Sequence, residues 1–198
     1  MTNSYSTQGT PSIAQLTDTI ISNPQNGDVL QYNSTTGVWN NGVLGNPYLL
    51  TMYSDTQGLV NLPINTNTDI PFTDIDAYGS ASASDWDIGD KEWTCPVSGL
   101  YHFVLQAEGT GNTYDTLQGW QSFIQYEPSG GTFSKIATQV IFTGTDDDLA
   151  SVCNNLSRYY VVNVGDKIKG TVWVRVGGGS GQVDFRDRKT YLQIAKLI

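Results

Sequence analysis

Apolar side chains concentrate in one stretch near the middle of the chain, WTCPVSGLYHFVLQ, at residues 93–106. From residue 100 onward the side chains alternate between two largely apolar sets: Leu100, His102 and Val104 against Tyr101, Phe103 and Leu105. A strand that is apolar on both faces must be covered twice, by neighbouring strands and by a second surface. Residues 96–99, PVSG, provide the turn before it. The pattern predicts a buried strand around which the rest of the chain is organised.

Shorter runs of the same kind lie on both sides of this stretch and are separated by turn residues. Gly165 and Asp166 form the strongest turn signal, between two runs rich in β-branched residues. The many glycines and aromatic residues also favour short strands, so we expect an all-β class. The predicted strands are residues 48–53, 59–62, 70–75, 119–126, 135–143, 157–164, 169–176 and 191–198.

The amino-terminal part differs from the rest. Residues 26–41, NGDVLQYNSTTGVWNN, predict a small hairpin, and residues 42–47, GVLGNP, predict a hinge. We therefore expect two parts, an attachment segment at 1–46 and a head domain at 47–198. An isolated two-stranded hairpin is only marginally stable in water, so Tyr32 and Trp39 are expected to pack against sister chains or a host surface.

Residues 96–103 spell Pro-x-Ser-Gly-Leu-Tyr-x-Phe, which resembles the hallmark of the globular heads of complement subcomponent C-one-q and the tumour necrosis factor superfamily. IPFTDID at 70–76, VVNVGDKIKGTVWV at 161–174 and TYLQIAKLI at 190–198 agree in the expected order. The resemblance spans about residues 48–198. It implies a ten-stranded jelly-roll sandwich that assembles as a compact homotrimer, and it implies no catalytic residues. We expect four aromatic residues in its core or at its three-fold axis: Tyr101, Phe103, Tyr160 and Tyr191.

A second resemblance concerns the amino-terminal segment. LTDTIIS at 16–22 followed by GDVLQYNSTTGVW at 27–39 is similar to a short module of phage and giant-virus fibre and capsid-surface proteins. The other interpretation is a decorated loop before the head. The chain has no collagen-like Gly-x-y run, on which many complement-type heads are presented. The resemblance therefore implies attachment to a virion rather than to a collagen stalk.

Charge is distributed unevenly along the chain. Residues 1–90 contain nine carboxylates and no Lys or Arg, and the formal net charge of the whole chain is -9. This balance argues against nucleic-acid binding and against attraction to an anionic membrane surface. No stretch approaches the roughly 20 apolar residues of a membrane span, and the first residues do not resemble a secretory signal. We expect synthesis in the host cytoplasm and a place on the virion surface.

Few residues offer catalytic or metal-binding chemistry. His102 is the only histidine, and mid-strand it is expected to be packed or to face the trimer rather than to catalyse. Cys95 and Cys153 allow one disulfide bridge, but we expect both to be reduced and buried. Asp146, Asp147 and Asp148 are weak candidates for calcium ligands, with a solvated acidic tip as the simpler account. We expect no other cofactor.

These observations lead to one main hypothesis and one alternative. The main one is a non-enzymatic virion structural protein, a trimeric capsid-decoration or fibre-head protein anchored to capsid or fibre proteins by its amino-terminal segment. The alternative is a receptor- or carbohydrate-binding head that recognises a host-surface receptor or glycan. In the alternative, loop aromatics stack on sugar rings; the candidates are Trp86, Tyr114 and Trp120, which otherwise serve as loop anchors.

Overall fold

The computed structural model describes residues 19–20, 28–33, 36–43, 47–111, 117–142, 151–177 and 180–197. The chain forms two compact units, Met1–Asn46 and Pro47–Ile198, and each is described by itself. Within the described ranges both are built from strands, and the second unit also contains two single-turn 3₁₀ helices, η2 (Ala83–Asp85) and η3 (Arg186–Arg188).

The first unit is a small three-stranded sheet. Strands β2 (Asp28–Asn33) and β3 (Val38–Val43) pair antiparallel, and β1 (Thr19–Ile20) pairs parallel with β3. Gly37 has a φ of 72°, the left-handed conformation that a tight turn between two strands requires. Tyr32 lies opposite Trp39 with their ring centroids 5.3 Å apart. The predicted hairpin is confirmed.

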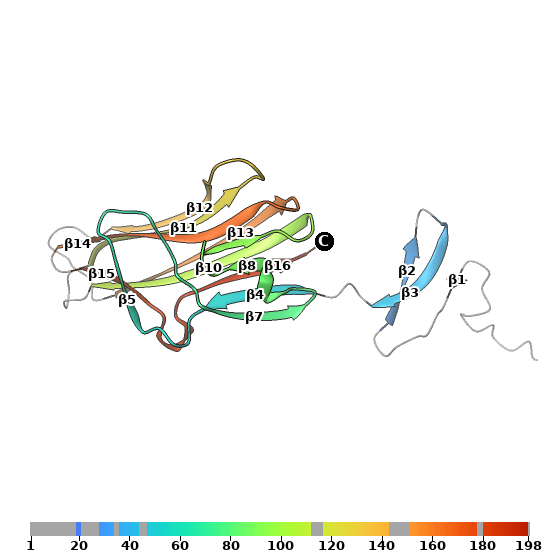
Figure 1. The fold of residues 1–198 in the computed structure, drawn as a ribbon, viewed down its shortest axis with the longest axis horizontal. Coiled ribbons are helices and arrows are strands. Elements are labelled where there is room, and N and C mark those ends of the chain that lie inside the picture. The colour runs from blue at the N-terminus through green and yellow to red at the C-terminus, as the bar shows by residue number, and fades with distance from the viewer. Residues whose placement is uncertain are drawn as a thin grey trace, which may run out of the picture. The chain divides into compact units, whose positions relative to one another are not determined.

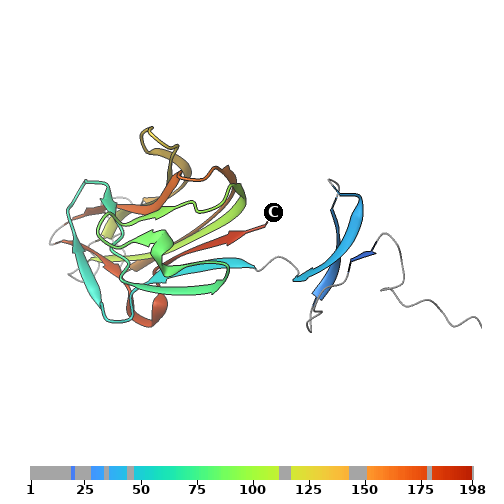
Figure 2. The same ribbon diagram turned by 45° about the vertical axis from the view of Figure 1, so that its right-hand side comes forward.

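The second unit, the head, consists of two sheets that run along its length in separate layers (Figures 1 and 2). The first sheet has the order β5-β15-β10-β16-β4-β7, with β13 paired to the other edge of β10. The second has the order β12-β11-β14-β9-β8, with β6 paired to β14. The strands are β4 (Tyr48–Tyr53), β5 (Leu59–Leu62), β6 (Thr68–Asp69), β7 (Asp74–Gly79), β8 (Trp86–Asp87), β9 (Glu92–Thr94), β10 (Gly99–Gly111), β11 (Leu117–Glu127), β12 (Ser134–Phe142), β13 (Ser151–Val162), β14 (Lys167–Val176), β15 (Gly181–Asp184) and β16 (Tyr191–Lys196).

The central stretch of the sequence divides between the two sheets. Its first residues form β9 in the second sheet, and after the PVSG turn the chain crosses to β10 at the centre of the first. Tyr101, Phe103 and Leu105 are fully buried, whereas Leu100 and Val104 on the opposite face are only half-buried. The prediction of a strand buried on both faces is wrong, because the second sheet covers only one of them.

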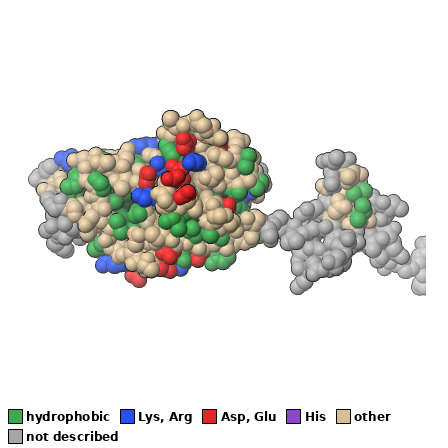
Figure 3. Space-filling model, in the orientation of Figure 1, with side chains coloured by type: hydrophobic (Ala, Val, Ile, Leu, Met, Phe, Trp, Pro, Cys, Tyr) green, Lys and Arg blue, Asp and Glu red, His purple; other side chains and the backbone are tan. Residues whose placement is uncertain are grey.

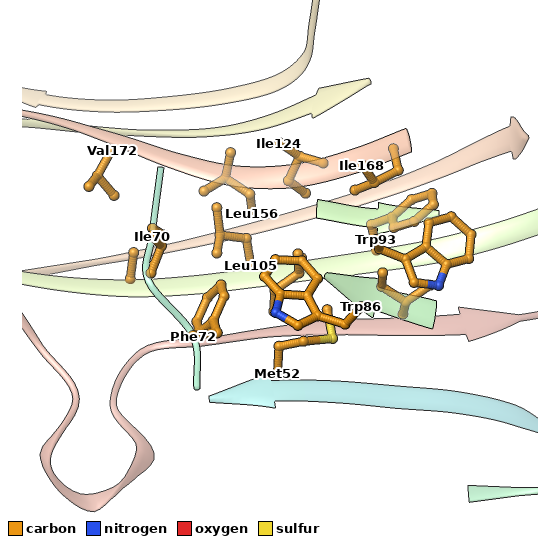
Figure 4. Close-up of a cluster of buried hydrophobic side chains, with 14 of the residues drawn as sticks. Met52, Ile70, Phe72, Trp86, Trp93, Leu105, Ile124, Leu156, Ile168 and Val172 are labelled. Atoms are coloured by element: carbon orange, nitrogen blue, oxygen red, sulfur yellow. The ribbon is translucent and has the colours of Figure 1, made fainter. Parts of the chain in front are cut away.

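The core fills the space between the sheets. In Figure 4, Met52 and Leu105 of the first sheet extend toward Ile124, Ile168 and Val172 of the second. Alternate residues along each strand enter this layer, as the period-two pattern of a sandwich requires.

The structure differs from the predicted strands at two places. Residues 70–75 were expected to form one strand, but Pro71 has no N–H to donate to a ladder, and pairing is interrupted between β6 and β7. Ile70 and Phe72 are instead buried in the core. The sequence also does not predict β15, which begins at Gly181, where an added Cβ would lie 2.3 Å from a methyl group of Val174.

Candidate functional site

The outer face of the first sheet has a row of apolar side chains that are exposed or half-buried. The strand registers place Leu49 beside Tyr78, and His102 between Ala195 and Tyr159. Leu100, Val161 and Leu197 lie next to this row. We call these side chains the apolar face: Leu49, Tyr78, Leu100, His102, Tyr159, Val161, Ala195 and Leu197.

Exposure of the apolar face is high for its residue types. Tyr159 and Val161 on β13 retain 59% and 65% of their accessible surface, and Tyr78 on β7 retains 57%. None of these side chains is an Asp, Glu, Lys or Arg. A contiguous exposed patch of this kind marks an interaction surface.

His102 lies at the middle of the apolar face. Its ring stacks on Tyr159 with centroids 4.4 Å apart, and its Nε2 lies 2.7 Å from the Oγ of Ser157. Among the described residues, no carboxylate is hydrogen-bonded to the other ring nitrogen to orient a catalytic base. The stacking and the hydrogen bond fix the imidazole within the apolar face.

A shallow pocket of about 240 Å³ adjoins the apolar face on the same sheet and is lined by Thr51, Tyr53, Arg188, Tyr191 and Gln193. The Arg188 guanidinium lies 3.8 Å from the centre of the Tyr53 ring. It also forms ion pairs with Asp55 at 3.1 Å and Asp76 at 3.0 Å. The hydrogen bonds to Asp55 raise the pKa of Arg188, so this side chain stays charged and forms a fixed polar wall of the pocket.

The structure separates the four aromatic residues that were predicted for the core or the three-fold axis. Tyr101 and Phe103 are fully buried in the core. Tyr160 is half-buried, with its ring centroid 4.9 Å from that of Tyr126. Tyr191 is half-buried in the wall of the pocket. Of the four, only Tyr191 therefore lies on the outer face of the first sheet.

Most of the other candidate residues are not at this surface. Trp86 and Trp120 are buried, 4% and 0% exposed, so neither can stack on a sugar ring, which excludes the alternative for these two and favours their interpretation as packed anchors. Cys95 is buried as expected, but Cys153 is exposed, because it lies on the outer face of the edge strand β13; both thiols are free. Tyr114, Asp146, Asp147 and Asp148 lie outside the described residues.

One buried carboxylate holds together the end of the head where β4 begins. Asp166, in the turn before β14, accepts hydrogen bonds of 2.8 Å from the Tyr126 hydroxyl and from the backbone N–H groups of Ser129 and Asn163. Its own backbone bonds to Cys95, and Gly165 has a φ of 85°. Burial alone would raise the pKa of Asp166, but these hydrogen bonds lower it below its usual value. Burial and the hydrogen bond to Asp166 raise the pKa of Tyr126 to about 12.

We predict that Asp166→Asn lowers the free energy of unfolding at pH 7 by about 2–3 kcal/mol, because an amide cannot accept all three hydrogen bonds. The pKa of Asp166 is lower in the folded chain, so its contribution is present above the unfolded value of about 3.9 and is lost as pH falls through the folded value. Denaturant unfolding between about pH 7 and pH 3 should show a smaller loss of stability in the variant. Asp90→Asn, at an exposed turn, is the control and should behave as wild type.

Paired charges occupy part of the second sheet's outer face. Lys167 pairs with Glu92 at 2.6 Å, and Lys169 pairs with Asp69 at 2.9 Å. Figure 3 shows acidic and basic side chains gathered side by side on one face of the head. In the described ranges, no group of three or more His, Cys, Asp or Glu side chains is arranged to hold a metal ion. No helix in the same ranges has the length and apolar character needed to cross a membrane.

Comparison with solved structures identifies the fold. The chain is similar to the Eiger TNF of S. frugiperda, with a TM-score of 0.58 and 9% identity over 77% of this chain and 94% of that one. It is also similar to murine APRIL, with a TM-score of 0.53 and 14% identity over 76% and 99% of the two chains. The globular domain of zebrafish complement 1qA has a TM-score of 0.49 and 14% identity over 77% and 97%.

The first two similarities confirm that the head is an all-β jelly roll of the tumour necrosis factor type. The predicted number of ten strands stays a prediction. No family model and no curated protein sequence matches the chain. The resemblance of the amino-terminal segment to a viral fibre module therefore rests on its sequence alone.

Proposed function

We propose that this chain is a non-enzymatic structural protein of a virion surface, whose head assembles as a homotrimer and whose amino-terminal segment attaches it to capsid or fibre proteins. The observation that carries the trimer is the apolar face, a wide exposed surface on a head that is otherwise well packed. Leaving Tyr159, Val161 and Tyr78 in water is unfavourable, and burial against sister chains removes that cost.

The two ends of the apolar face differ, which favours a ring over a two-fold dimer. One end is the exposed edge strand β13 with Tyr159 and Val161. The other end carries Leu49 and Tyr78 beside the pocket that contains Tyr191. When one end of a chain contacts the other end of its neighbour, the contact is heterologous, and a rotation that closes gives a cyclic oligomer. We infer that β13 of each protomer packs onto β4, β7 and β16 of the next.

The oligomeric state tests this proposal directly. Light scattering coupled to size exclusion should give a mass of about three times the 21.6 kDa of one chain at micromolar concentration. A single-chain mass would contradict the trimer, and a two-chain mass would contradict the heterologous contact.

The amino-terminal unit supports an attachment role. Ile20, Tyr32 and Trp39 retain 55%, 56% and 41% exposure, because the described residues of this unit form one small sheet without a second layer to cover them. Apolar side chains that a unit cannot bury by itself are suited to packing on another protein. Tyr32 and Trp39, already in contact with each other, are the residues that we expect to bind the capsid or fibre.

The virion role rests on this unit together with the viral-type pattern at residues 16–39. Antibodies against the head should label intact virions purified from infected host cells, at a copy number that is a multiple of three. Detection only in the cell fraction that is free of particles would contradict the virion role. That outcome would leave the trimer untouched.

A further inference from the structure

A second exposed aromatic surface lies on the opposite sheet from the apolar face. On the outer side of the second sheet, Phe142 of β12 lies across Gly119 of β11 from Arg175 of β14. In the next row, Val140 lies across Gln121 from Trp173. We call five of these side chains the aromatic platform: Phe142, Val140, Gln121, Trp173 and Arg175.

At the centre of the platform lies Gly119, which has no side chain and leaves room for the two rings above it. A Cβ added at Gly119 would lie 2.8 Å from the Phe142 ring and 3.3 Å from the Trp173 ring, so the two rings converge over this glycine. Their centroids are 5.9 Å apart with an interplanar angle of 71°. Phe142 nevertheless remains 56% exposed and Val140 44% exposed. The result is a shallow aromatic surface that is open to solvent.

Polar groups on the platform have no partner among the described residues. No hydrogen bond or ion pair there involves the Gln121 amide or the Arg175 guanidinium, whereas the nearby Lys167 and Lys169 are both ion-paired. Along β14, Trp173 and Arg175 point to the same side at a spacing of about 7 Å. One ligand can therefore contact the indole ring and the guanidinium together.

The chemistry of the platform restricts its ligand. Five side chains are far fewer than the roughly 20–30 residues per side of a stable protein interface. A purely apolar ligand would leave the amide and the guanidinium unpaired, and one unpaired guanidinium is too few cationic groups for nucleic acid, whose binding needs several phosphate contacts. A sugar ring has an apolar face for aromatic rings and hydroxyls for an amide, and a planar guanidinium binds a carboxylate in a bidentate manner.

We propose that the aromatic platform binds a saccharide that carries a carboxylate group. The sugar ring packs on Trp173 and Phe142, its hydroxyls bond to Gln121, and its carboxylate pairs with Arg175. Strand directions place the platform toward the end of the head that is remote from the start of β4 (Figure 1). It also lies on the other sheet from the apolar face, so it stays exposed in the proposed trimer, and the two proposals can fail independently.

Calorimetric titration of the full chain tests this inference with two acidic probes, trigalacturonate and sialyllactose, and one neutral probe, maltohexaose. At least one acidic probe should bind, and which one binds distinguishes a uronate from a sialate ligand. Trp173→Ala and Phe142→Ala should each weaken binding by about ten-fold or more. Arg175→Gln should weaken acidic binding by about ten-fold and leave maltohexaose unchanged.

The matched control is Ile88→Ala, which removes an apolar side chain of similar exposure from the segment between β8 and β9, outside both the platform and the apolar face, and should bind as wild type. Circular dichroism of each variant separates loss of binding from loss of the fold. Phe142 is the last residue of β12, so Phe142→Ala is the substitution that should disturb the fold least. The proposal is overturned if neither acidic probe binds, if maltohexaose binds as tightly as the acidic probes, or if folded Phe142→Ala and Trp173→Ala retain wild-type affinity. A lysate protein captured only by the wild-type platform, with no sugar bound, would indicate a protein partner instead.

Discussion

Val161→Asp should convert the trimer into single chains. Val161 is 65% exposed on β13 and is part of the apolar face, so the substitution adds a charge without disturbing the core of its own head. In the assembled trimer each of the three chains would bury one such carboxylate without a charged partner. An uncompensated buried charge costs several kcal/mol, so the trimer should dissociate at micromolar concentration.

The measurement is again light scattering, with circular dichroism to confirm the fold. The variant should elute with the mass of one 21.6 kDa chain and keep a wild-type spectrum. Ile64→Asp is a matched control, because Ile64 is an exposed aliphatic residue that lies in the segment between β5 and β6, away from the apolar face. A trimer that persists in Val161→Asp would place the subunit contact elsewhere.

Trp93→Ala should cause the largest loss of stability in the head. Trp93 is fully buried, and its ring lies 5.1 Å from Tyr101 and 5.9 Å from Phe103, centroid to centroid. Its Nε1 donates a 2.6 Å hydrogen bond to the Tyr48 hydroxyl, which donates in turn to Asp85 at 2.9 Å. The substitution leaves a cavity between the sheets and an unpaired acceptor, at a cost of about 3–5 kcal/mol.

Thermal unfolding should show a midpoint lower by about 2–4 °C for each kcal/mol lost. Trp93→Phe is the informative companion, because it keeps most of the volume and removes only the hydrogen bond to Tyr48. Its cost should be about 1–2 kcal/mol. Equal losses in the two variants would mean that the hydrogen bond, rather than the packing, holds this part of the core.

The strand pattern could be predicted from the sequence where local signals agreed. β4 and β5 have the predicted bounds, and the turn at Gly165 and Asp166 lies where its dipeptide indicated. The predictions failed at two places. Pro71 has no N–H to donate and interrupts an apparently continuous strand, and β15 begins at Gly181, where the contact with Val174 leaves no room for a larger residue.

The site predictions depended on which face of each strand points into the core, and a single sequence does not contain this information. Tyr101 and His102 are neighbours in an apolar run, yet the first is in the core and the second is on the apolar face. Trp120 and Trp173 are both strand tryptophans, yet the first points between the sheets and the second points out beside Phe142. The sequence showed that side chains alternate along each strand. It did not show which of the two alternating sets faces the second sheet.

The sequence by itself determined the all-β class, the hairpin around Tyr32 and Trp39, and most of the head's strands, because alternation and turn chemistry act over a few residues. Only the tertiary structure decided which face of β10 stays open, and that Phe142, Gln121 and Trp173 share one surface. Those facts depend on the register between β11, β12 and β14, and on where the second layer ends. Such pairings join residues far apart in the chain, and their geometry exists only after the sheets have packed.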